Sequence, residues 1–460
     1  MADTVDIISP INGEVYATRP LASSSEIDAA LQRAKVAQRL WRSVPLAERI
    51  AAVTRMVDAL LAMNDEIVPE LAWQMGRPIR FGGEKRGVEE RARHMLAIAP
   101  EALATMQRPD KPGFIRSIAR EPLGVVLVIA PWNYPFLTAG NSIFPGLVAG
   151  NAVLLKHASQ TLLAGERFAA AARDANLPEG IFQNLVLGHA DTEKLIASGQ
   201  VDHINFTGSV EGGRRIEKAA AGTFATLGLE LGGKDPAYVR ADADLDNAAE
   251  NLADGSFFNS GQSCCGVERI YVHASAYDGF VERFIAQARG WTLGDPRDPE
   301  TIVGPMARGN FADHVRAQTD EALRAGATRH LNTQHERDKP GSPWLAPEVL
   351  TGVNHQMSVM REESFGPVVG IMKVADDAEA ITLMNDSPYG LTASIWTADL
   401  DAAQRIGAEI ETGTVFANRC DYLDPALVWT GIKDTGKGGA LSEIGYHNLT
   451  QPKSYHFKIV

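Results

Sequence analysis

The sequence predicts an α/β fold built from two doubly wound (Rossmann-like) α/β domains with a small β flap. Three observations predict this class. The continuous apolar, β-rich run LGVVLVIAP at 123–131 has the composition of a strand buried on both faces of a parallel sheet. Strand-like and helical segments alternate after it, in two separate regions. The length of 460 residues is too great for one simple core.

Helical periodicity dominates the chain before this strand. A serine cluster at 23–25 precedes a segment in which Ile27, Leu31 and Ala34 recur at helical spacing. A second segment of the same kind begins at Pro45, a residue that a helix tolerates in its first turn. These patterns predict two amphipathic helices.

The alternation continues after residue 150. The runs NAVLLK (151–156) and HINFTGS (203–209) predict strands, and each precedes a helical segment. FATLGLELGG (224–233) predicts the next strand, so the order β-α-β-α-β indicates a doubly wound sheet. The second alternating region runs from 265 to 419, and PKSYHFKIV (452–460) alternates like a strand.

Composition restricts the class of protein. The chain has 44 basic and 57 acidic residues and a formal net charge of −13, which argues against nucleic acid or an anionic membrane as a partner. Residues 1–20 lack a basic segment followed by an apolar run, and no apolar run reaches the roughly 18 residues of a membrane-spanning helix. Three cysteines cannot form a disulfide framework. We therefore expect a soluble, cytoplasmic protein.

Two glycine-rich segments are similar to phosphate-binding turns. GIKDTGKG (431–438) has the spacing of a P-loop, but Gly438 stands where Ser or Thr would bind magnesium, and no predicted strand leads into it. FTGSVEGG (206–213) follows a predicted strand and opens a helix, where Gly208 and Ser209 would present amides and a hydroxyl to a pyrophosphate. A simple capped turn explains the second segment equally well.

The segment GQSCCG (261–266) contains two of the three cysteines, Cys264 and Cys265. A zinc site is disfavoured, because adjacent cysteines point to different sides and no second Cys or His pair has ligand spacing, so we expect no metal. A vicinal redox pair and an inert buried thiol remain alternatives. The third interpretation is a thiolate nucleophile, because Gly261 and Gly266 would let backbone and substrate approach the sulfur.

Two further polar residues stand in apolar or rigid surroundings. Glu230 lies in the apolar run LELGGK, so it either pairs with a structural cation or has a raised pKa that suits a general base. Asn133 in PWNYPF (131–136) follows the end of a predicted buried strand, where open α/β sheets bind ligands. Its amide either holds a turn together or stabilises an oxyanion.

Six motifs, in this order, resemble those of the aldehyde dehydrogenase superfamily, the NAD(P)-dependent, non-phosphorylating enzymes. They are PWNYPF, LLKHAS, FTGS, LELGGK, GQSCCG and EESFGPV, and the similarity runs from SPINGEV near the start to GTVFANR late in the chain. The resemblance implies an oxidoreductase that oxidises an aldehyde to its carboxylic acid with NAD(P)+.

The resemblance also implies roles for three residues. Cys264 would form a thiohemiacetal and then a thioester, Asn133 would contribute to the oxyanion hole, and Glu230 would act as the general base. Two alternatives stay open: a cysteine-dependent esterase or acyltransferase that needs no cofactor, and a CoA-acylating semialdehyde dehydrogenase. The retained Glu230 disfavours the second alternative.

The cofactor site implied by the resemblance lies in the same motifs. Its candidate residues are Trp132, Lys156, Ser159, Gly208, Ser209, Leu231, Glu363 and Phe365. NAD-preferring relatives often have Glu at the position of Ser159, and a serine removes the charge that would repel a 2′-phosphate. We therefore expect NAD or NADP as the cofactor, and the sequence does not decide between them.

The substrate pocket is expected between the helix after PWNYPF and the loop at 419–433, which departs from the PFGG pattern of the family. Its candidate residues are Tyr134, Thr138, Asn141, Cys265, Leu423 and Trp429. This mixed wall predicts a small-molecule aldehyde of medium size with some polarity. Arg419 would either meet a substrate carboxylate or pair with Asp421 or Asp424.

The expected domains follow from these assignments. A dinucleotide-binding domain is expected at 1–105 and 123–231, and a catalytic domain with the nucleophilic Cys at 232–441. The segments 106–122 and 442–460 resemble the protruding hairpin of the family and the strand that joins a neighbouring subunit. We therefore expect a homodimer or homotetramer.

Overall fold

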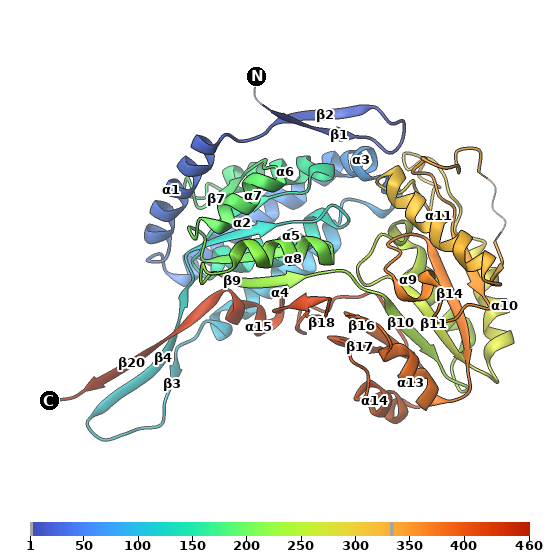
Figure 1. Ribbon diagram of the computed structural model, residues 1–460. Helices are drawn as coiled ribbons and strands as arrows, with labels where there is room; N and C mark the ends of the chain where they lie inside the picture. The colour runs from blue at the N-terminus through green and yellow to red at the C-terminus, as the bar shows by residue number, and fades with distance from the viewer. Residues whose placement is uncertain (1–2, 332–334) are drawn as a thin grey trace.

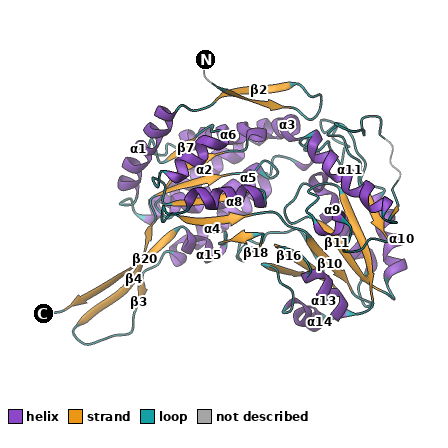
Figure 2. Cartoon of the chain, viewed as in Figure 1, coloured by secondary structure: helices purple, strands orange, loops and turns teal. Residues whose placement is uncertain are grey.

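The computed structural model describes residues 3–331 and 335–460. Two lobes, each built around a mainly parallel sheet, lie beside one another, and a β arm projects from the first lobe and carries the C-terminus (Figure 1). Helices pack against both sheets (Figure 2). The α/β class with doubly wound sheets, predicted from the alternation of strands and helices, is confirmed.

The first lobe contains a six-stranded sheet in the order β19-β9-β8-β5-β6-β7. Neighbouring strands from β9 to β7 are parallel, and β19 pairs antiparallel with β9. Every residue of β5 and β6 is buried, which explains why both strands have continuous apolar sequences. The strands are β5 (Val125–Ile129), β6 (Ala152–Lys156), β7 (Phe182–Asn184), β8 (His203–Thr207), β9 (Thr226–Glu230) and β19 (Gly436–Lys437).

The strand order of this sheet reverses between β5 and β8. The chain runs outward from β5 to β6 and β7 and then returns to β8 on the other side of β5. In open α/β sheets, ligands bind at the carboxyl ends of the strands where this reversal occurs. The segments 131–136 and 206–213 follow these two strands, so both candidate motifs lie at the expected crevice.

Helices cover this sheet, and local sequence sets where several of them begin. Ser23 caps the first helix: its Oγ accepts a hydrogen bond from the Glu26 amide at 3.3 Å, and the Glu26 carboxylate accepts one from the Ser23 amide at 2.8 Å. The helices are α1 (Ser24–Trp41), α2 (Leu46–Ala62), α3 (Asn64–Met75), α4 (Lys85–Ala102), α5 (Pro135–Val148), α6 (Leu162–Asp174), α7 (His189–Ala197), α8 (Val210–Ala220) and α15 (Ser442–Asn448), with short 3₁₀ turns η1 (Ile79–Phe81) and η2 (Ser159–Thr161).

The second lobe contains a seven-stranded sheet in the order β12-β13-β14-β11-β10-β16-β17. Only the edge strand β12 is antiparallel to its neighbour in this sheet. The strands are β10 (Asp235–Val239), β11 (Val267–His273), β12 (Thr328–Arg329), β13 (Glu348–Thr351), β14 (Val368–Val374), β16 (Thr392–Trp396) and β17 (Thr414–Ala417). The helices are α9 (Leu245–Phe257), η3 (Phe258–Gly261), α10 (Tyr277–Ala288), α11 (Gly309–Arg324), α12 (Ser358–Arg361), α13 (Asp377–Asn385) and α14 (Leu400–Gly407).

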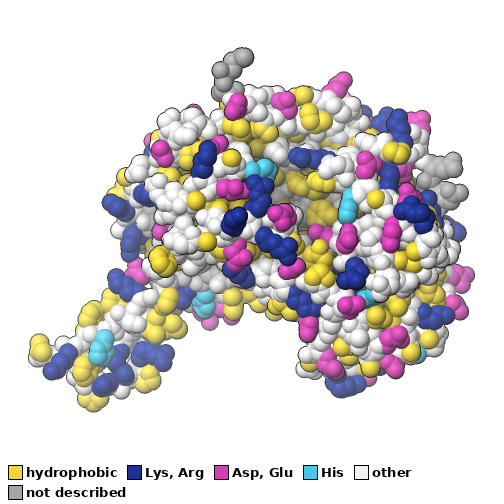
Figure 3. Space-filling model, in the orientation of Figure 1, with side chains coloured by type: hydrophobic (Ala, Val, Ile, Leu, Met, Phe, Trp, Pro, Cys, Tyr) yellow, Lys and Arg dark blue, Asp and Glu magenta, His cyan; other side chains and the backbone are white. Residues whose placement is uncertain are grey.

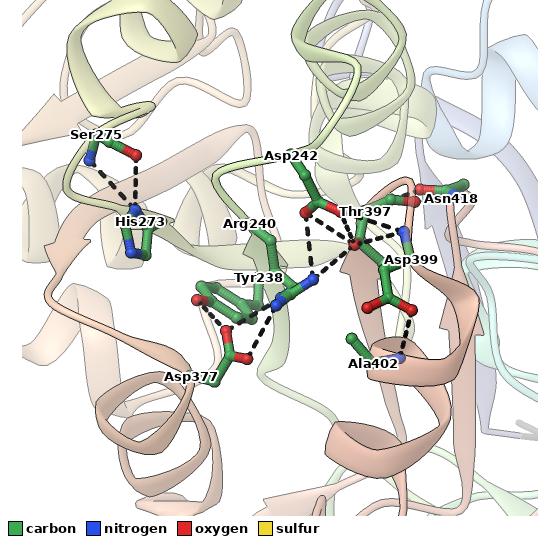
Figure 4. Close-up of polar contacts among 10 residues, drawn as sticks. All are labelled: Tyr238, Arg240, Asp242, His273, Ser275, Asp377, Thr397, Asp399, Ala402 and Asn418. Atoms are coloured by element: carbon green, nitrogen blue, oxygen red, sulfur yellow. Dashed lines mark hydrogen bonds and ion pairs between the residues drawn. The ribbon is translucent and has the colours of Figure 1, made fainter.

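Polar side chains fill the carboxyl ends of the second sheet (Figure 4). Arg240, directly after β10, donates to Asp377 at 3.1 Å and to the Thr397 hydroxyl at 2.9 Å. Thr397 in turn donates to Asp242 at 2.8 Å, and Asn418 bonds both polar atoms of the Thr397 backbone at 2.9 Å. These groups satisfy one another, so this end of the second sheet offers few free donors or acceptors to a nucleotide.

The projecting arm is a three-stranded sheet in the order β20-β4-β3. The last strand, β20 (Thr450–Lys458), pairs antiparallel with β4 (Phe114–Pro122) along its whole length, and β3 (Met106–Gln107) completes the sheet. The strand expected at 452–460 is therefore present, whereas residues 442–448 form α15 and pack against α4. Contact with a neighbouring subunit stays a prediction.

Three further segments complete the fold. The N-terminal hairpin of β1 (Thr4–Ile8) and β2 (Val15–Pro20) forms its own two-stranded sheet, which the sequence pattern did not predict. The P-loop-like segment 431–438 forms β18 (Ile432–Lys433), which pairs with β15 (Tyr389–Gly390), and then β19. No helix in the described part of the chain combines the length and apolar character needed to cross a bilayer.

Candidate active site

The segment that contains Cys264 lies between η3 and the amino end of β11. Asn259 and Ser260 have positive φ angles of 54° and 57°, and Gly261 follows with φ 68°. A Cβ atom at Gly261 would lie 2.3 Å from the backbone of Gly366, so only glycine fits between these two segments. This turn brings the thiol loop against the segment 363–367.

The LELGGK segment packs against the same loop. A Cβ atom at Gly233 would lie 2.3 Å from the carbonyl oxygen of Cys264. Directly after it, Lys234 forms a buried ion pair with Glu268, whose carboxylate also accepts the backbone amides of Ser364 at 2.8 Å and Phe365 at 2.9 Å. Three segments that are distant in sequence therefore meet around Cys264.

Glu230 is the last residue of β9 and faces the cavity beside Cys264. Its Oε2 accepts a hydrogen bond from the Thr207 hydroxyl at 3.2 Å. Burial raises the pKa of Glu230 to about 7, although the Thr207 hydrogen bond and the Arg91 charge act in the opposite direction. A carboxyl group with this pKa can take up or release a proton near neutral pH.

One cavity of about 280 Å³ contains both groups in its wall. All six residues expected to form the substrate pocket line it: Tyr134, Thr138, Asn141, Cys265, Leu423 and Trp429. The wall also includes residues that the sequence did not single out, namely Arg91, Leu137, Thr207, Asp254, Phe258, Ser263 and Asp421. The molecular surface is hollowed between the two lobes, with hydrophobic side chains inside the hollow (Figure 3).

Asn133 is buried beside the thiol loop rather than in the cavity wall. Its Nδ2 donates to the carbonyl oxygen of Gln262 at 3.1 Å. Its own carbonyl oxygen accepts from Arg77 at 2.6 Å and from the Asn259 amide at 3.2 Å. The side-chain amide of Asn133 is thus held against Gln262, which precedes Cys264 by two residues. The second N–H of this amide is left for another acceptor.

Two cationic side chains lie where the adenosine end of the cofactor is expected. Lys156 ends β6, is 8% exposed and forms no side-chain hydrogen bond within residues 3–331 and 335–460, and burial lowers its pKa. Ser159 accepts a hydrogen bond from Arg308 at 3.3 Å, and Arg308 also donates to Gln160 at 2.9 Å. Both cations are available to oxygen atoms of a ligand, so the residues present fit a nucleotide with negative charge.

The amino end of α8 provides a compact turn. Ser209 caps the helix by accepting from the Gly212 amide at 3.2 Å. A Cβ atom at Gly208 would lie 2.7 Å from the Phe206 ring, and one at Gly213 would lie 2.6 Å from Leu231. The glycines therefore let the chain pack closely, while the first amides of the helix stay available to an anion.

The residues expected around the nicotinamide come from both lobes. Glu363 accepts a hydrogen bond from the Gly233 amide at 2.9 Å, and burial raises its pKa to about 8. Phe365 packs edge-on against Trp132 with ring centres 5.6 Å apart, and Trp132 stacks on Phe311 at 5.5 Å. These aromatic contacts bring Trp132 of the first lobe and Phe365 of the second lobe together.

In the loop at 419–433, one of the two expectations for Arg419 is wrong, the pairing with Asp421 or Asp424, while contact with a substrate carboxylate stays a prediction. Its guanidinium lies over the Tyr422 ring at 3.8 Å, and it forms no ion pair with Asp421 or Asp424. The reason is that Asp421 points into the cavity, where its Oδ1 accepts from Cys265 at 2.8 Å and from Ser263 at 3.4 Å. A hydrogen bond to Cys264, burial and the Asp421 charge raise the pKa of the Cys265 thiol.

The residues in the described ranges include no group of three His, Cys, Asp or Glu side chains arranged to bind a metal. The geometry combines the ligand crevice of a doubly wound sheet with a thiol and a buried carboxylate, which is the arrangement of a nucleotide-dependent oxidoreductase with a catalytic cysteine. The chain belongs to the aldehyde dehydrogenase family, whose model matches residues 1–455. It is therefore an NAD(P)-dependent aldehyde dehydrogenase by family.

Known relatives cover nearly the whole chain. The succinate-semialdehyde dehydrogenase [NADP(+)] of Deinococcus radiodurans is 35% identical over 452 residues, which cover 97% of this chain and 93% of the relative. The 3,6-anhydro-alpha-L-galactose dehydrogenase of Streptomyces coelicolor is 34% identical over 460 residues, and the match covers 99% of this chain and 93% of the relative. The structure of PnpE from Pseudomonas sp. WBC-3 has a TM-score of 0.94 at 29% identity, and the match covers 99% of this chain and 94% of PnpE. PnpE has also been solved in complex with nicotinamide adenine dinucleotide.

The close approach of Gly261 to Gly366 gives a testable prediction. We expect Gly261→Ala to destabilise the protein by more than the roughly 1–2 kcal/mol that a positive φ angle alone costs a residue with a side chain, because the new methyl group would overlap the Gly366 backbone. The measurement is the free energy of unfolding in urea, together with dehydrogenase activity.

Gly222→Ala is the matched control for this substitution. Gly222 also has a positive φ angle, 83°, but no atom lies within 4 Å of a Cβ atom there. Its replacement therefore carries the backbone cost without the overlap. Equal losses of stability in the two variants would contradict the packing argument.

Proposed function

We propose that this chain oxidises a short, polar aldehyde to its carboxylic acid with NAD(P)+ through an acyl intermediate on Cys264. The observation that carries the proposal is the presence of Cys264 and Glu230 in the wall of one cavity, beside the carboxyl ends of β5 and β8. Residues 1–105 and 123–231 would bind the dinucleotide, and 232–441 would supply the thiol.

The thiolate of Cys264 would attack the aldehyde carbon, and the electron pair of the carbonyl would move to its oxygen. The Asn133 amide, fixed by Gln262, and the backbone N–H of Cys264 would stabilise this oxyanion. When bound, NAD(P)+ supplies the hydride acceptor that converts the thiohemiacetal on Cys264 into a thioester. Glu230 would then take a proton from water, which attacks the thioester and releases the acid together with the free thiolate.

Two sets of residues around the crevice would hold the two ends of the cofactor. Lys156, Ser159, Gly208 and Ser209 would bind the adenosine and pyrophosphate, and Trp132, Leu231, Glu363 and Phe365 would surround the nicotinamide and its ribose. No carboxylate stands at position 159, and Arg308 lies against Ser159, so a 2′-phosphate would meet positive charge. We therefore propose that NADP is accepted as well as NAD.

The substrate class rests on the cavity and on the relatives. The cavity is small, about 280 Å³, and combines Tyr134, Leu423 and Trp429 with polar residues. Relatives are named for succinate semialdehyde and for 3,6-anhydro-alpha-L-galactose, which are both short, oxygen-rich aldehydes. An aldehyde of this kind fits the mixed wall better than a long alkanal.

Substitution of the nucleophile tests the reaction. We expect Cys264→Ala to lower kcat for aldehyde oxidation by about a thousandfold or more, because no other group in the proposal can carry the acyl intermediate. The assay is NAD(P)H formation at 340 nm. Cys420→Ala removes the third thiol, which lies outside the cavity wall, and should retain activity within a few-fold.

The same assay separates this proposal from the esterase or acyltransferase alternative and from CoA acylation. An esterase would hydrolyse an activated ester and leave NAD(P)+ unreduced when aldehyde is added. A CoA-acylating enzyme would need CoA for turnover. Near-normal turnover by Cys264→Ala would refute the assignment of the nucleophile.

Glu230 gives a prediction for pH dependence. Its pKa is raised to about 7, so the carboxyl group is protonated below this pH and cannot take a proton from water. We expect thioester hydrolysis to slow as the pH falls through about 7 and to reach its plateau above it. In Glu230→Gln, an initial burst of NAD(P)H should remain, while the following steady-state rate falls about a hundredfold or more and loses this pH limb.

Glu348→Gln is the control for the pH profile. Burial also raises the pKa of Glu348 to about 7, but this residue lies in β13 and not in the cavity wall. Its substitution should leave the pH limb in place. If the steady-state rate of Glu230→Gln still fell as the pH decreased through about 7, a group other than Glu230 would be responsible for the pH dependence.

The cofactor proposal predicts a selective effect of Arg308→Met. We expect kcat/KM for NADP+ to fall about tenfold or more, while kcat/KM for NAD+ changes little, because only NADP+ carries the 2′-phosphate. Binding of adenosine 2′,5′-bisphosphate measured by calorimetry should weaken in parallel, whereas binding of 5′-AMP should not. Arg283→Met, at an exposed arginine of α10, is the control, and equal losses for both cofactors would contradict the proposal.

A further inference from the structure

Arg91 occupies an unusual place on α4. The helix buries Val88, Ala92 and Met95 against the core, and Arg91 stands three residues after Val88 and four before Met95. Residues with this spacing share one face of a helix, so the Arg91 side chain extends from the inward-facing side. It lines the cavity together with Cys264 and Glu230.

The Arg91 guanidinium has no protein partner there. Within residues 3–331 and 335–460 it forms no hydrogen bond and no ion pair, and burial lowers its pKa. Other arginines close to it are satisfied: Arg77 is buried and pairs with Glu84, and Arg93 on the same helix pairs with Asp58. Arg91 is half-buried in the wall of the cavity, so its unpaired guanidinium is available to a group that arrives with the ligand.

Asn141 of α5 shows the same lack of a partner. It is 5% exposed, lines the same cavity, and its Oδ1 is buried without a hydrogen bond in the described part of the chain. Arg91 and Asn141 also share a second, smaller void between α4 and α5. Two polar side chains from neighbouring helices therefore lie close together in this wall without protein partners.

We propose that Arg91, assisted by Asn141, binds a carboxylate at the end of the substrate remote from the aldehyde. The substrate class would be aldehydes that carry a second, acidic group. The planar guanidinium can donate two parallel hydrogen bonds to a carboxylate, which a hydroxyl group cannot match, and it repels an ammonium group. The Asn141 Nδ2 can donate to the same oxygens, whereas its Oδ1 is an acceptor that a guanidinium N–H, and not the carboxylate, can satisfy.

Glu230 and Asp421 attract the Arg91 charge through space, but neither carboxylate forms a hydrogen bond or ion pair with it in the described part of the chain. The Asp421 carboxylate already accepts hydrogen bonds from Cys265 and Ser263. Asp254 lies in the same wall, where burial and the Asp421 charge raise its pKa to about 6, and it forms no bond with Arg91 in the described part of the chain. Glu230 has a pKa near neutrality and is partly protonated at pH 7. Arg91 is thus the basic residue of this wall, and no carboxylate bonds it in the described part of the chain.

The inference rests on the proposed function, because it places the aldehyde at Cys264. Its test compares substrates that differ only in the remote group: succinate and glutarate semialdehydes, each against its methyl ester, with 4-aminobutanal and glyceraldehyde as cationic and hydroxylated probes. For the wild-type protein we expect kcat/KM for one of the two semialdehydes to exceed that of its ester about tenfold or more.

Substitutions of Arg91 test whether its guanidinium causes the preference for the acid over the ester. In Arg91→Met the ratio of acid to ester should fall to about one, and Arg91→Lys should give an intermediate ratio because one charge remains without the planar fork. The ratio is the readout because loss of the Arg91 charge also removes an influence that lowers the pKa of Glu230, which affects acid and ester alike. Arg93→Met changes an arginine of the same helix that pairs with Asp58 and should leave the ratio unchanged. Calorimetry should show that the wild-type protein binds succinate or glutarate more tightly than the monomethyl ester.

The outcomes separate this inference from the proposed function. Oxidation of the esters without any preference for the acids, a preference for 4-aminobutanal or glyceraldehyde, or an unchanged ratio in Arg91→Met would overturn the carboxylate site and leave the reaction at Cys264 intact. Failure of the wild-type protein to oxidise every aldehyde of the panel would overturn the proposed function itself. If Arg91→Met does not fold, the wild-type substrate ratios and the calorimetry decide the question.

Discussion

The buried ion pair between Lys234 and Glu268 is the interaction on which the site depends. Lys234 follows Gly233, which packs against the Cys264 carbonyl, and Glu268 lies at the start of β11. The Glu268 carboxylate also accepts the amides of Ser364 and Phe365. One carboxylate thus connects three segments: the loop that carries Cys264, the segment 363–367 expected to contact the nicotinamide, and the segment 229–234 that contains Glu230. Loss of either partner would leave an uncompensated buried charge, so the pair holds these segments in their present arrangement.

The two sheets contribute opposite ends to the site. The first sheet offers the carboxyl ends of β5 and β8, where its strand order reverses, while the second sheet offers the amino ends of β10 and β11. The carboxyl ends of the second sheet are occupied by the network around Arg240 and Thr397. The same kind of fold therefore serves as a nucleotide platform in one lobe and as a rigid support for a thiol in the other.

Much of this organisation could be predicted from the sequence, because the strands of the first sheet are apolar runs and the motifs follow them directly. Residues whose roles depend on tertiary contacts could not be predicted. Arg91 lies in a charged helical stretch that looks like a solvated surface, and only packing turns it inward. The sequence left two partners open for Arg419, a substrate carboxylate or an aspartate of its own loop, and the second does not occur because Asp421 adopts a positive φ angle of 47° and points to Cys265. No local pattern reports such a turn.

The hydrogen bond from Cys265 to Asp421 has a consequence for chemical labelling. The sequence offers two adjacent sulfur atoms to an electrophile, but a hydrogen bond with Cys264, burial and the Asp421 charge all raise the pKa of the Cys265 thiol, so the second sulfur keeps its proton. A covalent probe that enters the cavity would therefore find a single reactive atom. Of the two adjacent cysteines, Cys264 is therefore the one expected to react, and the surroundings of Cys265, Asp421 included, set this selectivity.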